Sequence, residues 1–274
     1  MQLALLTDVF RRMDVHRAIA AAAAAGFTAL ELNACYNWDP HVNLEAADWR
    51  REITAVERTA ASHGVRIPIV ACYPNLAATN RDERDRAIEY CARGMEACAM
   101  LGGRLITVMP GGNNLLPTGP QQGALISALS ALCELGSRQH VAIAIESYPG
   151  NCVEGTADLA GLVRRLGCPH LGYLLCTAHL AARGEDLVRA YDLSRDVLRH
   201  VHLSDSRTAT PSHEHLIPGL GDIPLTGLVE RLQADGYSGL LSLQIYSHAM
   251  EAEEAAVRAL VAVQQFCHDG RARQ

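Results

Sequence analysis

The chain has 274 residues, of which 49% are hydrophobic, so it can bury a large core. Its formal net charge of −6 excludes the extensive basic surface that binding to nucleic-acid phosphates requires. The sequence contains no lysine, which excludes Schiff-base chemistry and a lysine general base.

The first residues and the cysteines predict a cytoplasmic protein with no membrane partner. Residues 1–10 lack the basic segment of a signal peptide, and no apolar run reaches the roughly 18 residues of a membrane span. The nine cysteines are scattered through apolar segments rather than spaced as a framework. We therefore expect reduced thiols that pack as small core residues.

Eight apolar, strand-like runs alternate with eight helix-like segments along the chain. The strand-like runs are 2–8, 28–34, 66–73, 104–110, 141–147, 170–176, 198–204 and 239–245. The helix-like segments are 14–26, 44–64, 81–102, 120–139, 156–167, 185–194, 224–236 and 249–270. This alternation without a linker predicts an α/β protein, a single (β/α)8 TIM barrel over residues 1–274, with 270–274 as a frayed tail.

Polar side chains end the last four strand-like runs. Because side chains alternate along a strand, the inward faces of these runs carry Glu146, Cys176, His202 and Gln244. His179 follows Cys176 by three residues, and in such a barrel the C-terminal strand ends carry the active site. Carboxylate, thiolate and imidazole suit zinc, whereas the amide is a weak oxygen donor. A hydrogen-bonded polar cluster without a metal explains the same residues equally well.

The stretch from Leu198 to Ile223 holds four of the twelve histidines within sixteen residues. His200 and His202 share one face of the seventh strand-like run, and His213 and His215 lie in the polar loop that follows. A strand that ends in histidines and opens into a polar loop is typical of ligands at the rim of a barrel. A solvated loop without a ligand is the alternative.

At these residues the chain resembles the xylose isomerase-like barrel superfamily. The likeness rests on GFTALEL, IAIES, YLLCTAHLAARGED, HVHLSDSR and HLIPGLGDI, in that order. The superfamily contains sugar isomerases and epimerases, hydroxypyruvate isomerase, inosose and dehydroshikimate dehydratases, and abasic-site endonucleases. The resemblance implies one divalent ion, zinc or manganese, held by Glu146, Cys176, His202 and Gln244. The family has Asp and Glu in place of Cys176 and Gln244, so we expect weaker or different metal binding, or none.

The resemblance also implies contacts with substrate. His179 matches a histidine that touches substrate, and Arg207 resembles an arginine that grips substrate hydroxyl or phosphate groups, although a surface arginine is as good an interpretation. The predicted substrate-binding residues are Arg207, His213 and Gln244. His213 and His215 match a zinc-binding loop of the nuclease branch, but that branch needs a histidine where this chain has Met109. We therefore expect no nucleic-acid partner.

The sequence thus predicts an isomerase or epimerase of a small polyhydroxylated carbonyl compound. Glu146 is the predicted base for a proton beside the carbonyl, with His179 and His202 as further catalytic groups. Apolar surroundings should raise the pKa of Glu146. A lyase or dehydratase on a hydroxy ketone is the second hypothesis, because it needs only one base and one acid. The third is a metal-free degenerate barrel with a binding role. A homodimer or a homotetramer is compatible with the sequence.

Overall fold

Eight parallel strands close into a barrel in the computed structural model, which describes residues 2–36, 38–208, 214–246 and 250–272, with side chains up to residue 266. The strands follow one another around the barrel in chain order, and the last pairs with the first. They are β1 (Gln2–Leu6), β2 (Ala29–Asn33), β3 (Arg66–Ala71), β4 (Leu105–Val108), β5 (Ala142–Glu146), β6 (Leu171–Cys176), β7 (Leu198–Leu203) and β8 (Leu240–Leu243). The predicted (β/α)8 TIM barrel is confirmed.

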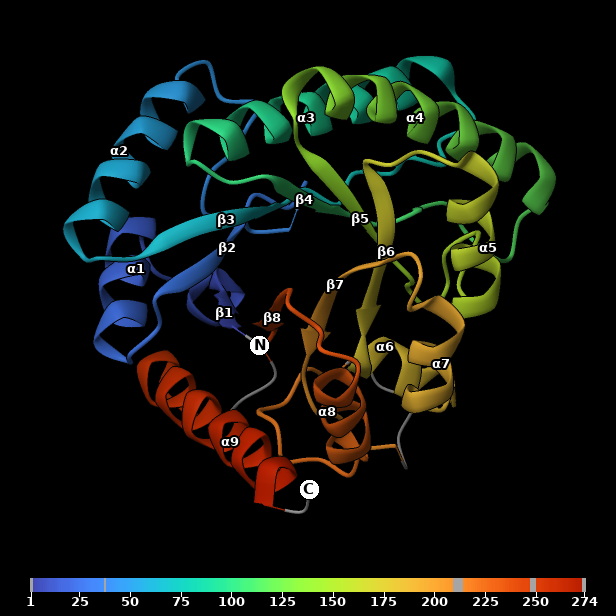
Figure 1. Ribbon diagram of the computed structural model, residues 1–274. Coiled ribbons are helices and arrows are strands. Elements are labelled where there is room, and N and C mark those ends of the chain that lie inside the picture. The colour runs from blue at the N-terminus through green and yellow to red at the C-terminus, as the bar shows by residue number, and fades with distance from the viewer. Residues whose placement is uncertain (1, 37, 209–213, 247–249, 273–274) are drawn as a thin grey trace.

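Helices form an outer ring around these strands (Figure 1). The described helices are the 3-10 helix η1 (Thr7–Phe10) and the α-helices α1 (Val15–Ala24), α2 (Trp49–Ser62), α3 (Arg81–Met100), α4 (Thr118–Gln139), α5 (Thr156–Leu166), α6 (Thr177–Ala182), α7 (Leu187–Ser194), α8 (Leu225–Ala234) and α9 (Ala252–Ala272). Helix α9 packs against both α8 and α1, which closes the ring. It continues through residues 270–272 of the predicted tail, and residues 273–274 lie outside the described part of the chain.

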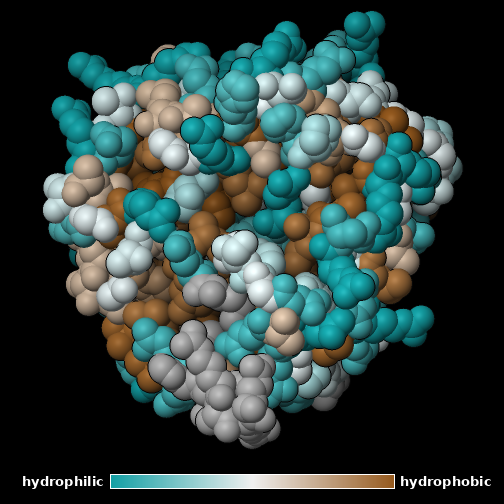
Figure 2. Space-filling view, viewed as in Figure 1, coloured by the Kyte–Doolittle hydropathy of each residue, from teal (hydrophilic) through white to brown (hydrophobic). Residues whose placement is uncertain are grey.

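The two faces of each strand are buried in different surroundings. Outward residues such as Ile143, Val201 and Leu241 join the main hydrophobic core beneath the helices. Inward residues such as Ala144 and Leu174 form a small separate cluster in the barrel interior. Figure 2 shows hydrophilic residues over the outer helices and hydrophobic residues between them. None of the described helices is both long enough and apolar enough to span a bilayer.

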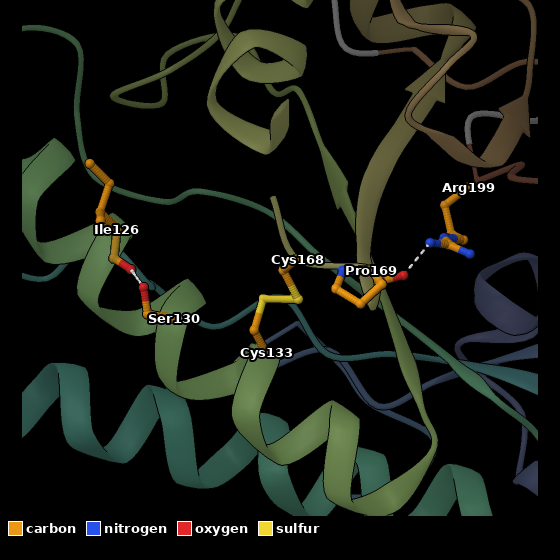
Figure 3. The surroundings of a disulfide bond; sticks show 6 residues. All are labelled: Ile126, Ser130, Cys133, Cys168, Pro169 and Arg199. Carbon is orange, nitrogen blue, oxygen red and sulfur yellow. Dashed lines mark hydrogen bonds between the residues drawn. A yellow bond between two sulfur atoms is a disulfide. The ribbon is translucent and has the colours of Figure 1, made fainter. Parts of the chain in front are cut away.

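Cys133 and Cys168 form a disulfide, so the prediction of reduced cysteines is wrong for this pair. Cys133 lies in α4, and Cys168 lies in the turn that precedes β6, with 6.3 Å between their Cα atoms (Figure 3). The two residues are 35 positions apart in the sequence, and they meet only because α4 packs beside the strands of this part of the barrel. The six other cysteines whose side chains are described are buried thiols.

Candidate functional site

The four predicted metal-binding side chains lie together at the C-terminal end of the barrel. Glu146 ends β5, Cys176 ends β6, His202 lies in β7 and Gln244 directly follows β8. In the strand register Cys176 pairs with His202, and His202 pairs with Ser242. Cys176 and His202 are therefore direct neighbours across β6 and β7, and all four predicted side chains are buried.

The donor atoms of these residues are spaced as ligands of one ion would be. Gln244 Oε1 lies 3.1 Å from His202 Nδ1 and 3.6 Å from Cys176 Sγ. Glu146 Oε1 lies 3.7 Å from His202 Nδ1. Zinc bonds of about 2.0–2.3 Å in a tetrahedral arrangement put neighbouring ligand atoms roughly 3.3–3.7 Å apart. The donor set, with its thiol and imidazole, therefore fits zinc better than a hard cation such as manganese.

A second group of metal-ligating side chains shares Cys176. Its other members are His179 in α6 and His215 in the loop after β7, and the three ligand atoms lie within 4.8 Å of one another. Cys176 Sγ is 3.6 Å from His215 Nε2. Because α6 begins immediately after Cys176, its first turn carries His179 back toward the strand end. The sequence connected His215 only with a nuclease, whereas the structure places it beside Cys176.

Glu146 is held as a carboxylate by two histidines. Its Oε1 lies 2.9 Å from His179 Nδ1 and 3.7 Å from His202 Nδ1. Although burial favours the neutral acid, the two imidazoles outweigh burial and hold the pKa of Glu146 well below its ordinary value. The prediction of a raised pKa is therefore wrong. The apolar run 141–147 suggested a raised pKa, but Glu146 lies beside His179 and His202 in the structure. These histidines come from other segments of the chain, so only the tertiary structure brings them to Glu146.

Sequence reasoning missed a buried carboxylate next to this site, Glu31 of β2. It accepts a hydrogen bond from Thr107 Oγ1 at 2.8 Å, and its Oε2 lies 3.2 Å from His200 Nε2 and 3.1 Å from His202 Nε2. The ring of His202 is thus fixed by Glu31 at one nitrogen, while the other faces Gln244. An acid inside the apolar run 28–34 was the available signal, because a buried acid needs a partner.

His202 is charged in the metal-free protein. Burial lowers the pKa of His202, but the carboxylates of Glu31 and Glu146 outweigh burial and raise it to about 10. An imidazolium can donate from both ring nitrogens. Here Nδ1 faces Gln244 Oε1 and Nε2 faces Glu31 Oε2, and both oxygens are acceptors. A cation that binds at Nδ1 must therefore displace a proton, so metal affinity should rise with pH.

We expect the free energy of unfolding of the metal-free protein to fall as pH rises from 7 to 8.5. The pKa of His202 is raised above its unfolded value of about 6.5, so its contribution is complete below that pH and is lost as pH rises through the folded value of about 10. The slope should approach about 1.4 kcal/mol per pH unit. Urea denaturation after chelation measures it. His202→Asn should remove the slope, and an equal slope in that variant would contradict the assignment.

A cavity of about 230 Å³ has Glu146, His179 and Gln244 in its wall. The rest of the wall is largely aromatic and is formed by Asp8, Cys35, Tyr36, Trp38, Tyr73, Met109, Tyr148 and Tyr246. A mainly apolar wall with a few convergent polar groups is typical of a small-molecule site. Asp8 is the last residue of the first strand-like run, 2–8, and a polar side chain at that strand end was the available signal for it.

Arg207, one of the predicted substrate-binding residues, does not line this cavity. Arg207 is exposed and forms an ion pair with Glu214 at 3.0 Å, beside a separate surface hollow near residues 181–187. His213 lies outside the described residues. Among the three residues predicted to bind substrate, Gln244 is therefore the one whose described position lines the cavity.

The chain is similar to a known protein family in sequence and to several solved structures in fold. Residues 19–265 match the profile of a family described as xylose isomerase-like TIM barrel. Fructoselysine 3-epimerase of Escherichia coli O157:H7 is 23% identical over an alignment that covers 97% of each chain. The crystal structure of a D-tagatose 3-epimerase-like protein superposes with a TM-score of 0.85 at 19% identity, covering 100% of this chain and 99% of that one. The IOLI protein with a bound zinc atom superposes with a TM-score of 0.81 at 17% identity, covering 98% and 99%.

Proposed function

We propose that this chain, which belongs to the xylose isomerase-like TIM barrel family, is an isomerase or epimerase of a small polyhydroxylated carbonyl compound. The observation that carries the proposal is Glu146, a buried carboxylate in the wall of a small, mainly aromatic cavity. Removal of a proton beside a carbonyl needs a positioned base of this kind. The similarity to a fructoselysine 3-epimerase and to a D-tagatose 3-epimerase-like protein supports a sugar-derived substrate.

Glu146 takes the proton from the carbon beside the carbonyl. Its oxygen forms the new O–H bond, and the electrons of the broken C–H bond form the C=C bond of an enolate. His179 Nδ1, 2.9 Å away, orients the carboxylate for this transfer. Gln244 presents Oε1 to His202 and Cys176, which leaves its amide N–H groups for a substrate oxygen. A return of the proton to a different atom, or to the other face, completes isomerisation or epimerisation.

We further propose that Glu146, Cys176, His202 and Gln244 hold one divalent ion. When bound, such an ion supplies positive charge that stabilises an oxyanion on the substrate. The bound zinc of the IOLI protein supports a metal in a barrel of this shape. Thiol and imidazole donors favour zinc, because manganese prefers carboxylate oxygens.

We expect zinc to bind more tightly than manganese, and Gln244→Glu to raise the affinity for manganese by about tenfold or more, since even outer-shell changes alter metal affinity 10–100-fold. The added carboxylate gives manganese a hard anionic ligand. Metal analysis after dialysis and competition titration measure both effects. Stoichiometric manganese in the dialysed wild-type protein would contradict this expectation.

Two further variants tell which residues hold the ion. His202→Ala should abolish zinc binding, because His202 belongs to the proposed set. His215→Ala should leave zinc bound, because His215 belongs only to the second group around Cys176. The opposite result would move the ion to Cys176, His179 and His215.

Proton exchange tests the proposed activity without knowledge of the natural substrate. D-fructose, D-tagatose, D-psicose and L-ribulose are incubated with the protein in D2O, and NMR follows deuterium at the carbon beside the carbonyl and the formation of the epimer or aldose. We expect exchange and product formation on at least one of these sugars, with zinc added. An absence of both on all four would overturn the proposal.

A lyase is the second candidate, and the position of Gln244 favours it. The family resemblance implies a glutamate there, and loss of that carboxylate leaves fewer groups for a reaction that needs two bases. One base and one acid suffice to expel a hydroxyl group from the β-carbon of an enolate. Release of water from 3-dehydroshikimate or inosose, without epimer formation on the four sugars, would favour the lyase.

A further inference from the structure

Asp8 is a second buried carboxylate in the wall of the central cavity. It lies in η1, directly after β1, and is only 4% exposed. Asn33 Nδ2 donates to Asp8 Oδ1 at 2.5 Å, and Asn33 Oδ1 accepts from the backbone N–H of Cys35 at 2.9 Å. The second contact fixes the orientation of the amide, so Asn33 holds Asp8 in place.

Asp8 and Glu146 approach the cavity from opposite sides of the barrel. In the closed strand order, three strands separate β1 from β5 in either direction. Asp8 follows β1 and Glu146 ends β5, and both line the same cavity of about 230 Å³. A carbon atom held between them has one carboxyl group on each face. Gln244, at the β8 position, offers an amide that cannot take or give the proton of an acid.

The surroundings of Asp8 favour its protonated form. The charged and titratable groups that act on Asp8 are Arg11, Glu31, Glu146 and His202. Burial has the largest effect and raises the pKa of Asp8 to about 7. At neutral pH Asp8 is therefore protonated in part of the molecules and has a proton to give, on the side of the cavity opposite Glu146.

We propose that Asp8 is the second acid–base group, which delivers a proton to the face of the substrate opposite Glu146. This role rests on the proposed epimerase function. Glu146 takes the proton from one face and leaves the enolate. The Asp8 O–H bond then breaks as the enolate carbon takes that proton on the other face, and the carbonyl reforms. Glu146 ends protonated and Asp8 ends ionised, and proton exchange with water restores both for the next turnover.

The Asp8→Asn variant distinguishes proton exchange on the Glu146 face of the substrate from proton delivery on the opposite face. The amide keeps an acceptor for Asn33 but has no acidic proton, so we expect epimer formation on the responsive sugar to fall by about a hundredfold or more. Glu146 still removes and returns a proton on its own face. Deuterium from D2O should therefore continue to enter the starting sugar without inversion. Glu146→Gln should lose both exchange and inversion.

The same assay of deuterium exchange and epimer formation provides the control and the outcomes that contradict the proposal. Asp85→Asn, at an exposed position of α3, should change neither readout, and Asp8→Ser repeats the test if Asp8→Asn does not fold. Inversion at the wild-type rate in the folded Asp8 variants overturns the role of Asp8 and leaves the proposed function intact. Loss of exchange together with inversion also overturns it, because Asp8 would then act through Glu146. A wild-type protein that exchanges no proton on any of the four sugars overturns both proposals.

Discussion

Replacing Glu146 by glutamine should lower turnover on the sugar identified by proton exchange by at least about a hundredfold, the range of a lost general base. The side chain is fully buried, and its Oε1 lies 2.9 Å from His179 Nδ1, so the geometry of the amide can persist while its ability to accept a proton is lost. Comparison of kcat/KM for the variant and the wild-type protein, with zinc present in both, measures the effect.

The matched control for this variant is Glu57→Gln, on an exposed position of α2, which should leave kcat/KM unchanged. If Glu146→Gln retains activity within a few-fold, the base is another group of the site, with His179 and His202 as the nearest. The barrel would be unaffected by that result, because it does not depend on the identity of the base.

Glu31→Gln should lower the free energy of unfolding by about 3–5 kcal/mol, the cost of breaking a buried ion pair by removing one partner. Glu31 is fully buried and its carboxylate lies within 3.2 Å of both His200 Nε2 and His202 Nε2. Although burial opposes ionisation, these histidines hold the pKa of Glu31 below its ordinary value. Without the charge of Glu31, Glu146 is the carboxylate that remains to compensate the positive charge of the buried His202 imidazolium. Urea denaturation of the metal-free proteins at pH 7 measures the loss.

Thr107→Val is the comparison that separates charge from hydrogen bonding at Glu31. It removes one donor, at 2.8 Å from Glu31 Oε1, and leaves the carboxylate and both histidines in place. We expect a loss of about 1 kcal/mol, as for a single neutral hydrogen bond. A Glu31→Gln variant no less stable than Thr107→Val would show that the charge of Glu31 contributes little. The histidines would then have to be neutral in the fold.

The sequence by itself determined the barrel and which polar side chains of its strands face the interior. Apolar runs alternating with helical segments indicate parallel strands joined by crossover helices, and the two-residue alternation fixes which side chains point inward. That alternation was enough to predict that Glu146, Cys176, His202 and Gln244 all face the interior, because the direction of a side chain depends only on its position within its own strand. The same rule applies to Asp8 and Glu31, which lie in the strand-like runs 2–8 and 28–34.

Only the tertiary structure decided the charges and partners inside the barrel. The pKa of Glu146 is lowered rather than raised because His179 and His202 reach it from α6 and β7. Contacts between strands that are far apart in the sequence, such as the one between Glu31 and His202, depend on how the barrel closes. The Cys133–Cys168 disulfide and the exposed position of Arg207, paired with Glu214, arise in the same way, from loops and helices whose packing no local pattern specifies. Electrostatic effects depend on distances in space, whereas the sequence pattern specifies only neighbours along the chain and the face of each strand.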